Sequence, residues 1–490
     1  MRISRRANYI LSFLLLLLAL SYFYQVPNNP PGFYIDESSI AYNAHTIATT
    51  GRDEYGENWP LYFRAFGEYK NPVYIYLLAF LFRLFGPSIL VARLLSASLS
   101  VIAVGLLWLL AYRISRQKIV ATLIAISAFL TPWLFENSRL VFEVALYPVL
   151  MVLFLIAVHH ASKQERWRLR EALAIAATLI VLTYSYSIGR LLAPLLALGL
   201  AFFVTRQRWR GLVTVWAIYF LSLIPALVFN AQHPDALMNR FWLLTYITRE
   251  KSIWELALTF LRHYFANINP WTIAVTGEVN VRDHVGSMGS VLAPALLLAI
   301  AGIVYVIRRC AADAWWRYML FAIVVTPIPA SLTTTEFPQI RLIALPVLLH
   351  VFMTPSLSWL LNQEGSSAAR TVLAVLLLVM FAQGFVYRVQ FRKAGPERWY
   401  IFDEQFPREV FPTALGQNKF PIYFYDPPGK SGYAQMYWYG VLQGLPADNF
   451  VRLPPDEKPP NGAVVISTAE ECSDCRLLLK SINYIVYVAN

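Results

Sequence analysis

Long apolar stretches alternate with short polar segments along most of the chain. A helix needs about 20 apolar residues to cross the hydrocarbon core of a bilayer. The first such stretch is Tyr9–Tyr24, which follows Arg2, Arg5 and Arg6. Further apolar runs lie at residues 88–112, 119–134, 141–161, 171–188, 190–205, 211–230, 290–307, 316–332, 342–361 and 370–388. The pattern predicts a polytopic α-helical membrane protein with about 11–13 transmembrane helices.

Basic clusters between these runs indicate the orientation of the chain. Lys and Arg collect in cytoplasmic loops of membrane proteins. The clusters lie at residues 113–118, 163–170, 206–210 and 308–309. All of them fall inside the cell if the N-terminus is cytoplasmic and the short run Pro72–Phe85 does not cross. We therefore expect Pro72–Phe85, which Arg83 interrupts, to be an interfacial or re-entrant helix. Tyr9–Tyr24 is then a retained helix, segments 25–71 and 231–289 are outer loops, and the C-terminus is outside.

Composition supports a membrane protein and excludes several other classes. The chain of 490 residues is 57% hydrophobic and only 14% charged, whereas soluble domains carry about a quarter charged residues. An ordinary cytosolic enzyme and a disordered chain are both excluded. The net charge of +12 does not indicate a nucleic-acid partner, because the basic residues sit in short clusters between apolar runs. Three cysteines are too few for a disulfide framework.

The last hundred residues differ in composition from the rest. Pro, Asp, Gly and Asn return after about residue 390, and Pro421–Tyr425 and Ala463–Ser467 have the pattern of buried strands. Ala434–Leu442 is expected to form a short helix between them. We therefore predict a transmembrane domain over residues 1–390 and a small extracytoplasmic α/β domain over residues 391–490.

One C-x-x-C motif lies in this C-terminal region. Cys472 and Cys475 are surrounded by the acids Glu470, Glu471 and Asp474, which disfavour a reactive thiolate. We expect a small structural disulfide or two inert thiols rather than a redox centre. A single pair of cysteines without a second pair is also only weak evidence for a zinc site.

The first outer loop carries two adjacent acids, Asp36 and Glu37, just before a stretch that is expected to form an interfacial helix. Asp36 either caps this helix or takes part in chemistry. The loop ends on Glu68 and Lys70, and further polar residues are predicted on the same face of the membrane. They are Arg139, Glu143, Arg190, His284 and Arg341. A single such arginine usually anchors lipid headgroups, and His284 is equally well explained as a solvated loop residue. Together, acids facing Arg and Lys fit a site that activates a hydroxyl and holds a phosphate.

Residues 34–88 resemble the first outer loop of polyprenyl-phosphate-sugar-dependent glycosyltransferases with the GT-C fold, which are related to protein O-mannosyltransferases and the lipid A aminoarabinose transferase. The resemblance rests on Asp36-Glu37, on Tyr69-Lys70-Asn71-Pro72 and on Arg93. It extends through residues 132–143, 326–332 and 341–346. It covers roughly residues 9–390 and is strongest over 30–145. Asn71 departs from the family, which often has a second proline there.

The resemblance implies a fold, an activity and residue roles. It implies a GT-C fold and an inverting transfer of a hexose or pentose from a polyprenyl-phosphate carrier to a hydroxyl of a protein, lipid or glycan. Asp36 would be the general base, and Glu37 would orient the acceptor or hold the loop. Lys70, Arg139, Arg190 and Arg341 would contact the lipid phosphate, with Glu68, Glu143 and His284 near phosphate or acceptor. Glu68 is also a second candidate for the base. No cofactor and no obligatory metal are expected. A bacterial plasma membrane is implied as the location.

Two other functions remain open from the sequence. A transporter or flippase of a lipid-linked sugar is the main alternative, but such proteins place polar features near the bilayer midplane, whereas here the charges lie at one face. A catalytically inactive scaffold with the same fold is the other. The sugar, the acceptor and the oligomeric state are not specified by any motif.

Overall fold

The computed structural model describes residues 5–286, 288–363, 366–454, 456–472 and 475–490. Arg2 and Asp474, which entered the sequence analysis, lie outside the described residues. By its internal contacts the chain forms two compact units. The first, which we call the helical unit, comprises the described residues of Met1–Tyr24, Ser96–Ser138 and Glu143–Phe391. The second, which we call the mixed unit, comprises the described residues of Gln25–Leu95, Arg139–Phe142 and Arg392–Asn490.

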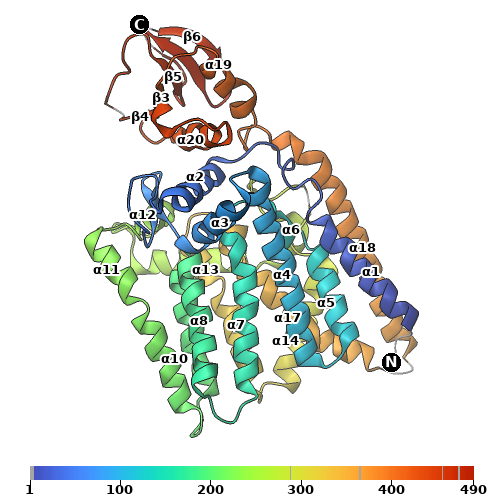
Figure 1. Ribbon diagram of the computed structural model, residues 1–490. Helices are drawn as coiled ribbons and strands as arrows, with labels where there is room; N and C mark the ends of the chain where they lie inside the picture. The colour runs from blue at the N-terminus through green and yellow to red at the C-terminus, as the bar shows by residue number, and fades with distance from the viewer. Residues whose placement is uncertain (1–4, 287, 364–365, 455, 473–474) are drawn as a thin grey trace. The chain divides into compact units, whose positions relative to one another are not determined.

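Each predicted apolar run coincides with one or two helices (Figure 1). The run at 119–134 is split at Thr131, because Pro132 has no N–H to continue the first helix and begins the next one. The helices outside the first loop and the C-terminal region are α1 (Arg5–Ser21), α4 (Ile89–Ser115), α5 (Lys118–Leu130), α6 (Pro132–Asn137), α7 (Tyr147–Ser162), α8 (Leu169–Ser185), α9 (Gly189–Gly199), α10 (Trp209–Leu221), α11 (Ile224–Gln232), α12 (Asn239–Leu244), α13 (Ile253–Asn267), α14 (Ala293–Arg309), α15 (Ala314–Val325), α16 (Ile328–Ser331), α17 (Ala344–Leu361) and α18 (Ser367–Ala394).

Several of these helices have the length and composition of membrane spans. Within the described residues, five are long and apolar enough to cross: Ile89–Ser115, Glu143–Ser162, Trp209–Gln232, Ala344–Leu361 and Ser367–Ala394. Shorter apolar helices lie at Tyr9–Ser21, Pro72–Phe85, Lys118–Leu130 and Gly189–Phe203. The prediction of a polytopic helical membrane protein is confirmed. The number of crossings and the interfacial placement of Pro72–Phe85 stay predictions.

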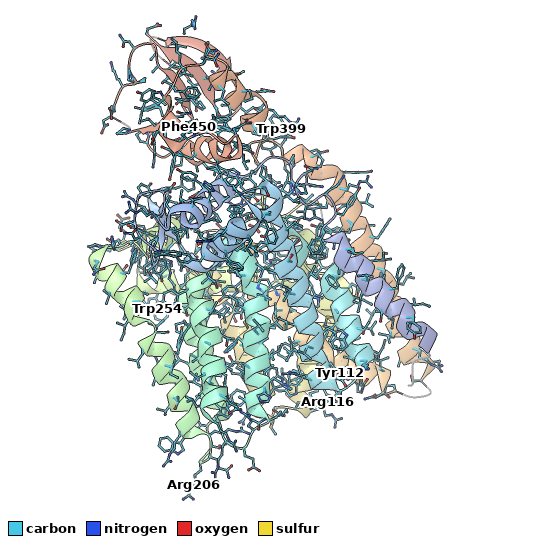
Figure 2. All side chains as sticks on the ribbon, in the orientation of Figure 1. Tyr112, Arg116, Arg206, Trp254, Trp399 and Phe450 are labelled. Atoms are coloured by element: carbon cyan, nitrogen blue, oxygen red, sulfur yellow. A yellow bond between two sulfur atoms is a disulfide. The ribbon has the colours of Figure 1, made fainter. Side chains whose placement is uncertain are left out.

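The helical unit is held together by close packing of its helices. Helices α7, α8 and α10 lie side by side, and α14 packs along α17 (Figure 1). A Cβ added at Gly302 of α14 would lie only 1.7 Å from the carbonyl oxygen of Phe352 in α17, so the missing side chain allows the two backbones to meet. Arg116 and Arg206, from two of the predicted cytoplasmic clusters, lie at the same end of this unit (Figure 2). This placement is what a shared cytoplasmic face requires.

The mixed unit begins with the first loop. Helix α2 (Ile35–Thr50) packs against α3 (Pro72–Phe85), and a hairpin of β1 (Phe63–Ala65) and β2 (Glu68–Lys70) joins them. The hairpin turns at Phe66 and Gly67, whose φ angles of 54° and 78° are those of a two-residue turn between twisted strands. Helix α3 has the predicted bounds, because Pro72 starts it and Gly86 ends it.

The C-terminal part of this unit is the predicted α/β domain. Its described residues form a sheet in the order β4-β3-β5-β7-β6. Strand β3 runs parallel to β4 and β5, while β7 runs antiparallel to β5 and β6. The elements are α19 (Phe411–Leu415), β3 (Ile422–Tyr425), α20 (Tyr433–Leu442), β4 (Phe450–Leu453), β5 (Val464–Ser467), β6 (Cys475–Lys480) and β7 (Ile485–Ala489). The two predicted strands and the predicted helix are confirmed. Cys472 and Cys475 form a disulfide, as in one of the two alternatives considered above.

The first loop and the α/β domain share one hydrophobic core. Trp438 of α20 is fully buried, and its ring stacks with those of Phe33 and Phe82 at centroid distances of 5.8 and 5.7 Å. Tyr42 of α2 stacks on Tyr437 of α20 at 5.0 Å. Residues 25–71, which the sequence analysis placed in the transmembrane domain, therefore pack in the same compact unit as residues 392–490.

Candidate active site

The first turn of α2 carries both acids of the first loop. The helix begins at Ile35 and its N-cap residue is Tyr34, whose N–H donates to Glu37 Oε2 at 2.8 Å. Glu37 therefore satisfies the open N–H at this end of the helix, and the interpretation of Asp36 as the N-cap is wrong. Both carboxylates also interact favourably with the positive end of the helix dipole.

The Glu37 carboxylate is buried, and both of its oxygens accept hydrogen bonds from protein groups. Arg93 donates to it from Nε at 3.3 Å and from Nη2 at 3.0 Å, and both side chains are fully buried. The N–H of Val141 donates to Glu37 Oε1 at 2.9 Å. Arg93 also donates to the carbonyl oxygens of Pro27, Pro30 and Gly32. This pair joins α2 to the start of α4, to the loop before α2 and to segment 139–142.

Asp36 faces a different environment although it is the adjacent residue. Its side chain is 27% exposed, and one carboxylate oxygen lies 2.5 Å from Lys70 Nζ. Lys70 is at the end of β2, is only 6% exposed, and has its ammonium 5.3 Å from the centroid of the Phe66 ring. The hairpin thus returns the lysine to the helix, and the pairing of Asp36 with Lys70 brings together two residues that the sequence analysis selected.

Two further predicted residues belong to the mixed unit. Glu68 is the first residue of β2 and is half-buried. Arg139 is buried and lies two residues before Val141, whose N–H binds Glu37. The Glu37–Arg93 pair therefore also fixes the backbone that carries Arg139.

The remaining predicted residues belong to the helical unit. Arg190, in the first turn of α9, donates from Nη1 to the carbonyl oxygen of Leu237 at 2.7 Å. Arg341 donates to the Thr333 hydroxyl at 2.9 Å, and burial lowers the pKa of Arg341. Glu143 is half-buried at the start of a short 3-10 helix, Glu143–Leu146. Each arginine has a polar partner within its own unit.

His284 is buried, so its interpretation as a solvated loop residue is wrong. Its Nδ1 lies 2.9 Å from Glu136 Oε2, and its Nε2 lies 2.7 Å from the carbonyl oxygen of Met288. Both ring nitrogens therefore face acceptors, which favours the doubly protonated ring. Burial by itself lowers the pKa of His284, but the Glu136 carboxylate, the Met288 carbonyl and Glu278 together outweigh it, and the pKa is raised overall.

Several charged residues around His284 were not selected from the sequence. Glu136 also accepts from the N–H of Val285 at 2.6 Å. Burial, followed by the nearby Asp283 carboxylate, raises the pKa of Glu278 to about 8. Arg282 pairs with Asp283 at 2.8 Å. Glu136 could have been identified from the sequence, because it is an acid beside an apolar run, where an uncompensated charge is costly.

The described residues contain no group of three or more His, Cys, Asp or Glu side chains placed to hold a metal ion.

No protein-family model matches this chain, and no curated protein matches it in sequence. Solved structures do resemble it. One is ArnT from Cupriavidus metallidurans bound to undecaprenyl phosphate, with a TM-score of 0.60, 13% identity and coverage of 97% of each chain. The apo state of the same protein gives a TM-score of 0.59 at 12% identity, over 99% of this chain and 98% of that one.

A second kind of protein shares the architecture over a shorter part of its own length. The apo oligosaccharyltransferase of Archaeoglobus fulgidus matches with a TM-score of 0.53 and 14% identity, over 92% of this chain and 65% of that chain. At these identities the similarity establishes the fold. The GT-C fold expected from the first-loop motifs is thereby confirmed: the chain is a multi-pass membrane protein with the architecture of these glycosyltransferases.

Proposed function

We propose that the protein is an inverting glycosyltransferase that moves a sugar from a polyprenyl-phosphate carrier to a hydroxyl acceptor at the outer face of the plasma membrane. The observation that carries the proposal is Asp36, a partly exposed carboxylate at the start of α2 that is paired with Lys70. Support comes from the fold, which is that of ArnT, a protein solved with undecaprenyl phosphate.

In this mechanism Asp36 accepts the proton of the acceptor hydroxyl as its oxygen attacks the anomeric carbon. The new bond forms from the face opposite to the carbon–phosphate bond, which breaks and releases polyprenyl phosphate. One base is sufficient because a phosphate ester is already a stable leaving group, unlike the alkoxide in glycoside hydrolysis. Once Asp36 holds the proton, it no longer carries the charge that attracts Lys70, and the Lys70 ammonium stabilises the departing phosphate.

The other residues fall into supporting roles. Glu37 holds the loop rather than orienting the acceptor, because its carboxylate is fully buried and both oxygens accept hydrogen bonds from the surrounding chain. We assign Arg139, Arg190 and Arg341 to the phosphate, since guanidinium binds phosphate with two parallel hydrogen bonds. Glu68 and Glu143 are assigned to the acceptor side. His284, held at both nitrogens, keeps the loop around residue 284 in place.

The test is transfer by the purified full chain from a panel of radiolabelled polyprenyl-phosphate sugars. Wild type should release sugar from at least one donor, and Asp36→Asn should lower the rate by about 10²–10⁴-fold, the range for loss of a general base. Asp448→Asn, an exposed acid in the same unit, is the matched control and should leave the rate unchanged.

Donor binding separates the possible failures. Turnover by Asp36→Asn at the wild-type rate would remove Asp36 from the mechanism. Movement of the donor across a vesicle membrane without any transfer would favour a flippase. Absence of donor binding by either protein would contradict the use of a polyprenyl-phosphate sugar.

A further inference from the structure

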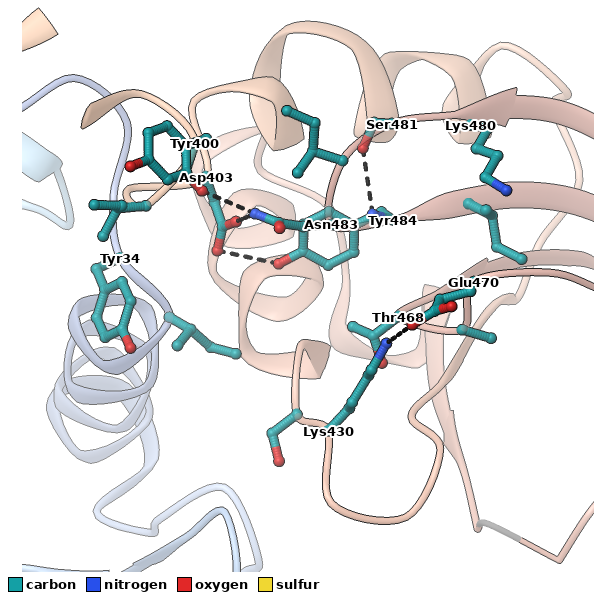
Figure 3. A pocket seen from close by; sticks show the side chains of 16 residues that line it. Tyr34, Tyr400, Asp403, Lys430, Thr468, Glu470, Lys480, Ser481, Asn483 and Tyr484 are labelled. Carbon is teal, nitrogen blue, oxygen red and sulfur yellow. Dashed lines mark hydrogen bonds and ion pairs between the residues drawn. The ribbon is translucent and has the colours of Figure 1, made fainter. Parts of the chain in front are cut away.

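A cavity of about 630 Å³ lies within the mixed unit and has no role in the mechanism above. Ser431 and Thr468, which follow β3 and β5, and residues 480–485 line it. Figure 3 shows Lys430 and Thr468 on one side of the cavity and Lys480 and Ser481 on another. Tyr34 and Ile35, directly before Asp36, complete the wall. This volume falls in the range of small-molecule sites.

The position of the cavity is the one where sheets of this type bind ligands. From β3 the chain passes through α20 to β4 on one side, and from β5 it continues to β6 and β7 on the other. The connections that leave β3 and β5 therefore diverge, which opens a crevice outside the carboxyl ends of these parallel strands. Residues from both carboxyl ends line the cavity.

The local charges indicate a neutral ligand rather than a phosphate. The loop after β3, Gly429-Lys430-Ser431-Gly432, leads into the N-terminus of α20, an arrangement that often binds phosphate. Here Asp426 already accepts from the N–H of Tyr433 at 3.4 Å and from the Thr468 hydroxyl at 2.9 Å, so a carboxylate neutralises the helix end. Lys430 pairs with Glu470 at 3.5 Å.

The walls offer ring faces and hydrogen-bonding groups together. Tyr34 and Tyr400 line the cavity, and Tyr400 is 45% exposed. Asp403 also lines it and accepts hydrogen bonds from Asn483 at 2.6 Å, Gln435 at 3.0 Å and Tyr484 at 3.1 Å. Sugars have C–H faces that pack on aromatic rings and hydroxyls that pair with amides and carboxylates.

The Asp403 carboxylate is poorly compensated in the free protein. Its three side-chain partners are uncharged, and burial, only partly offset by these donors, raises the pKa of Asp403 to about 6. A carboxylate under these conditions gains stability from additional hydroxyl donors. The cavity wall thus contains an acceptor that a sugar hydroxyl would satisfy.

The same group is linked to the turn that carries Asp36. Gln435 donates to Asp403 and to the carbonyl oxygen of Phe33, and it accepts from the Ser38 hydroxyl at 2.7 Å. Phe33 and Ser38 flank Asp36 in the chain, and the Cα atoms of Ile35 and Asp36 are about 3.8 Å apart. A ligand in the cavity therefore contacts the segment that leads directly to the proposed base.

We propose that this cavity is a binding site for a neutral saccharide and that it holds the glycan part of the acceptor. The saccharide site rests on the cavity and its chemistry, whereas its assignment to the acceptor rests on the proposed glycosyl transfer. The enzyme would accordingly extend a glycan or a glycan-bearing molecule.

Binding is tested without any donor, so the result is independent of transfer activity. The full chain is kept in a detergent without a sugar headgroup, because maltoside detergents would compete for the site. Saturation-transfer NMR and titration then report binding of methyl glycosides and of short neutral oligosaccharides. We expect at least one of them to bind wild type and Asp448→Asn equally, because Asp448 is exposed and does not line the cavity.

Cavity-filling variants locate the site. Ser431→Trp should weaken saccharide binding at least tenfold, whereas Asn461→Trp, in a second cavity of the same domain, should not change it. If Ser431→Trp fails to fold, Tyr400→Ala, which removes an exposed ring, serves instead with the same expected loss.

Three results would overturn the proposal. They are no binding by any saccharide, binding that Ser431→Trp or Tyr400→Ala leaves unchanged, or binding of Ser/Thr peptides alone at this site. Saccharide binding without transfer from any polyprenyl-phosphate donor would instead contradict the proposed function and leave the saccharide site in place.

Discussion

Each of the two units contains a buried carboxylate, and the two carboxylates are paired with different kinds of cation. In the mixed unit, the buried Glu37 is paired with Arg93, whose guanidinium is always charged. In the helical unit, the buried Glu136 is paired with His284, whose charge depends on pH. The first pair fixes the turn that carries Asp36, and the second fixes the loop around residue 284.

The comparison indicates which part of the protein responds to pH. The pKa of His284 is raised in the folded protein, so its contribution to stability is present below about 6.5, its ordinary value, and is lost as pH rises through the folded pKa. Glu278, whose pKa is raised from 4.5 to about 8, acts in the same direction, because the folded state binds the proton more tightly than the unfolded state.

The largest expected effect is removal of the permanent charge. Arg93→Met leaves Glu37 buried without a compensating charge and should lower the free energy of unfolding by about 3–5 kcal/mol. Lys70→Met is the matched variant and should lower it by only about 1 kcal/mol, because Asp36 is partly solvated. Thermal unfolding of both variants measures the difference in stability. Equal losses would show that burial does not distinguish the Glu37 pair from the Asp36 pair.

The second expected effect concerns turnover rather than folding. Lys70→Met should lower the rate of sugar transfer roughly 10²–10³-fold, in line with loss of one group that stabilises developing charge. Lys70→Arg retains the charge and should keep more of the rate. The assay is the radiolabelled transfer described above. A Lys70→Met enzyme with the wild-type rate would show that the lysine serves only to position Asp36.

The third expected effect is on pH dependence in the helical unit. The midpoint temperature of thermal unfolding of wild type should decrease as the pH is raised from 5 to 9, because the folded state holds extra protons on Glu278 and His284. The glutamine of Glu278→Gln cannot ionise, so the midpoint temperature of this variant should decrease less. The exposed Glu250→Gln should show the same decrease as wild type. Parallel curves for all three proteins would mean that Glu278 titrates normally.

The smallest expected effect is at Glu54 in the mixed unit. Burial raises the pKa of Glu54 to about 7, and one of its oxygens accepts from the Tyr433 hydroxyl at 3.1 Å. Below this pH the side chain is neutral in the folded protein, and below about 4.5 it is neutral in the unfolded chain as well, so Glu54→Gln should change the free energy of unfolding by less than about 1 kcal/mol near pH 4. At pH 8 the variant should be the more stable protein. A large loss near pH 4, measured by denaturant unfolding, would show that the charged form is the native one.

Local patterns explain the parts of the fold that were predictable. Helix α3 matches its predicted bounds because proline and glycine mark both of its ends. Strands β3 and β5 are short buried runs that are recognisable as such. Strand β6, Cys475–Lys480, was not predicted, because much of its side-chain surface is exposed and its pairing with β7 supplies the order.

The candidate site was predictable only in part, for a similar reason. Asp36 and Lys70 stand out because each is a charge beside a membrane segment. The pairing of the buried acids does not follow from the sequence, although Arg93 and His284 were both named there, because Arg93 is 56 residues from Glu37 and His284 is 148 residues from Glu136. Such long separations follow no helix or strand period, so the sequence does not indicate which cation pairs with which acid. Only the folded structure shows the pairs.

The hydrogen bond between Ser38 and Gln435 has a consequence for how the protein is made. These residues are 397 positions apart, and a ribosome that adds about 5–20 residues per second needs roughly 20–80 s to cover that distance. During this interval α2 and its neighbour α3 have already emerged, but α20, which also packs against α2, has not been synthesised. A nascent chain therefore passes through insertion of its membrane helices with the proposed catalytic turn still incomplete, and it acquires that turn only near the end of translation.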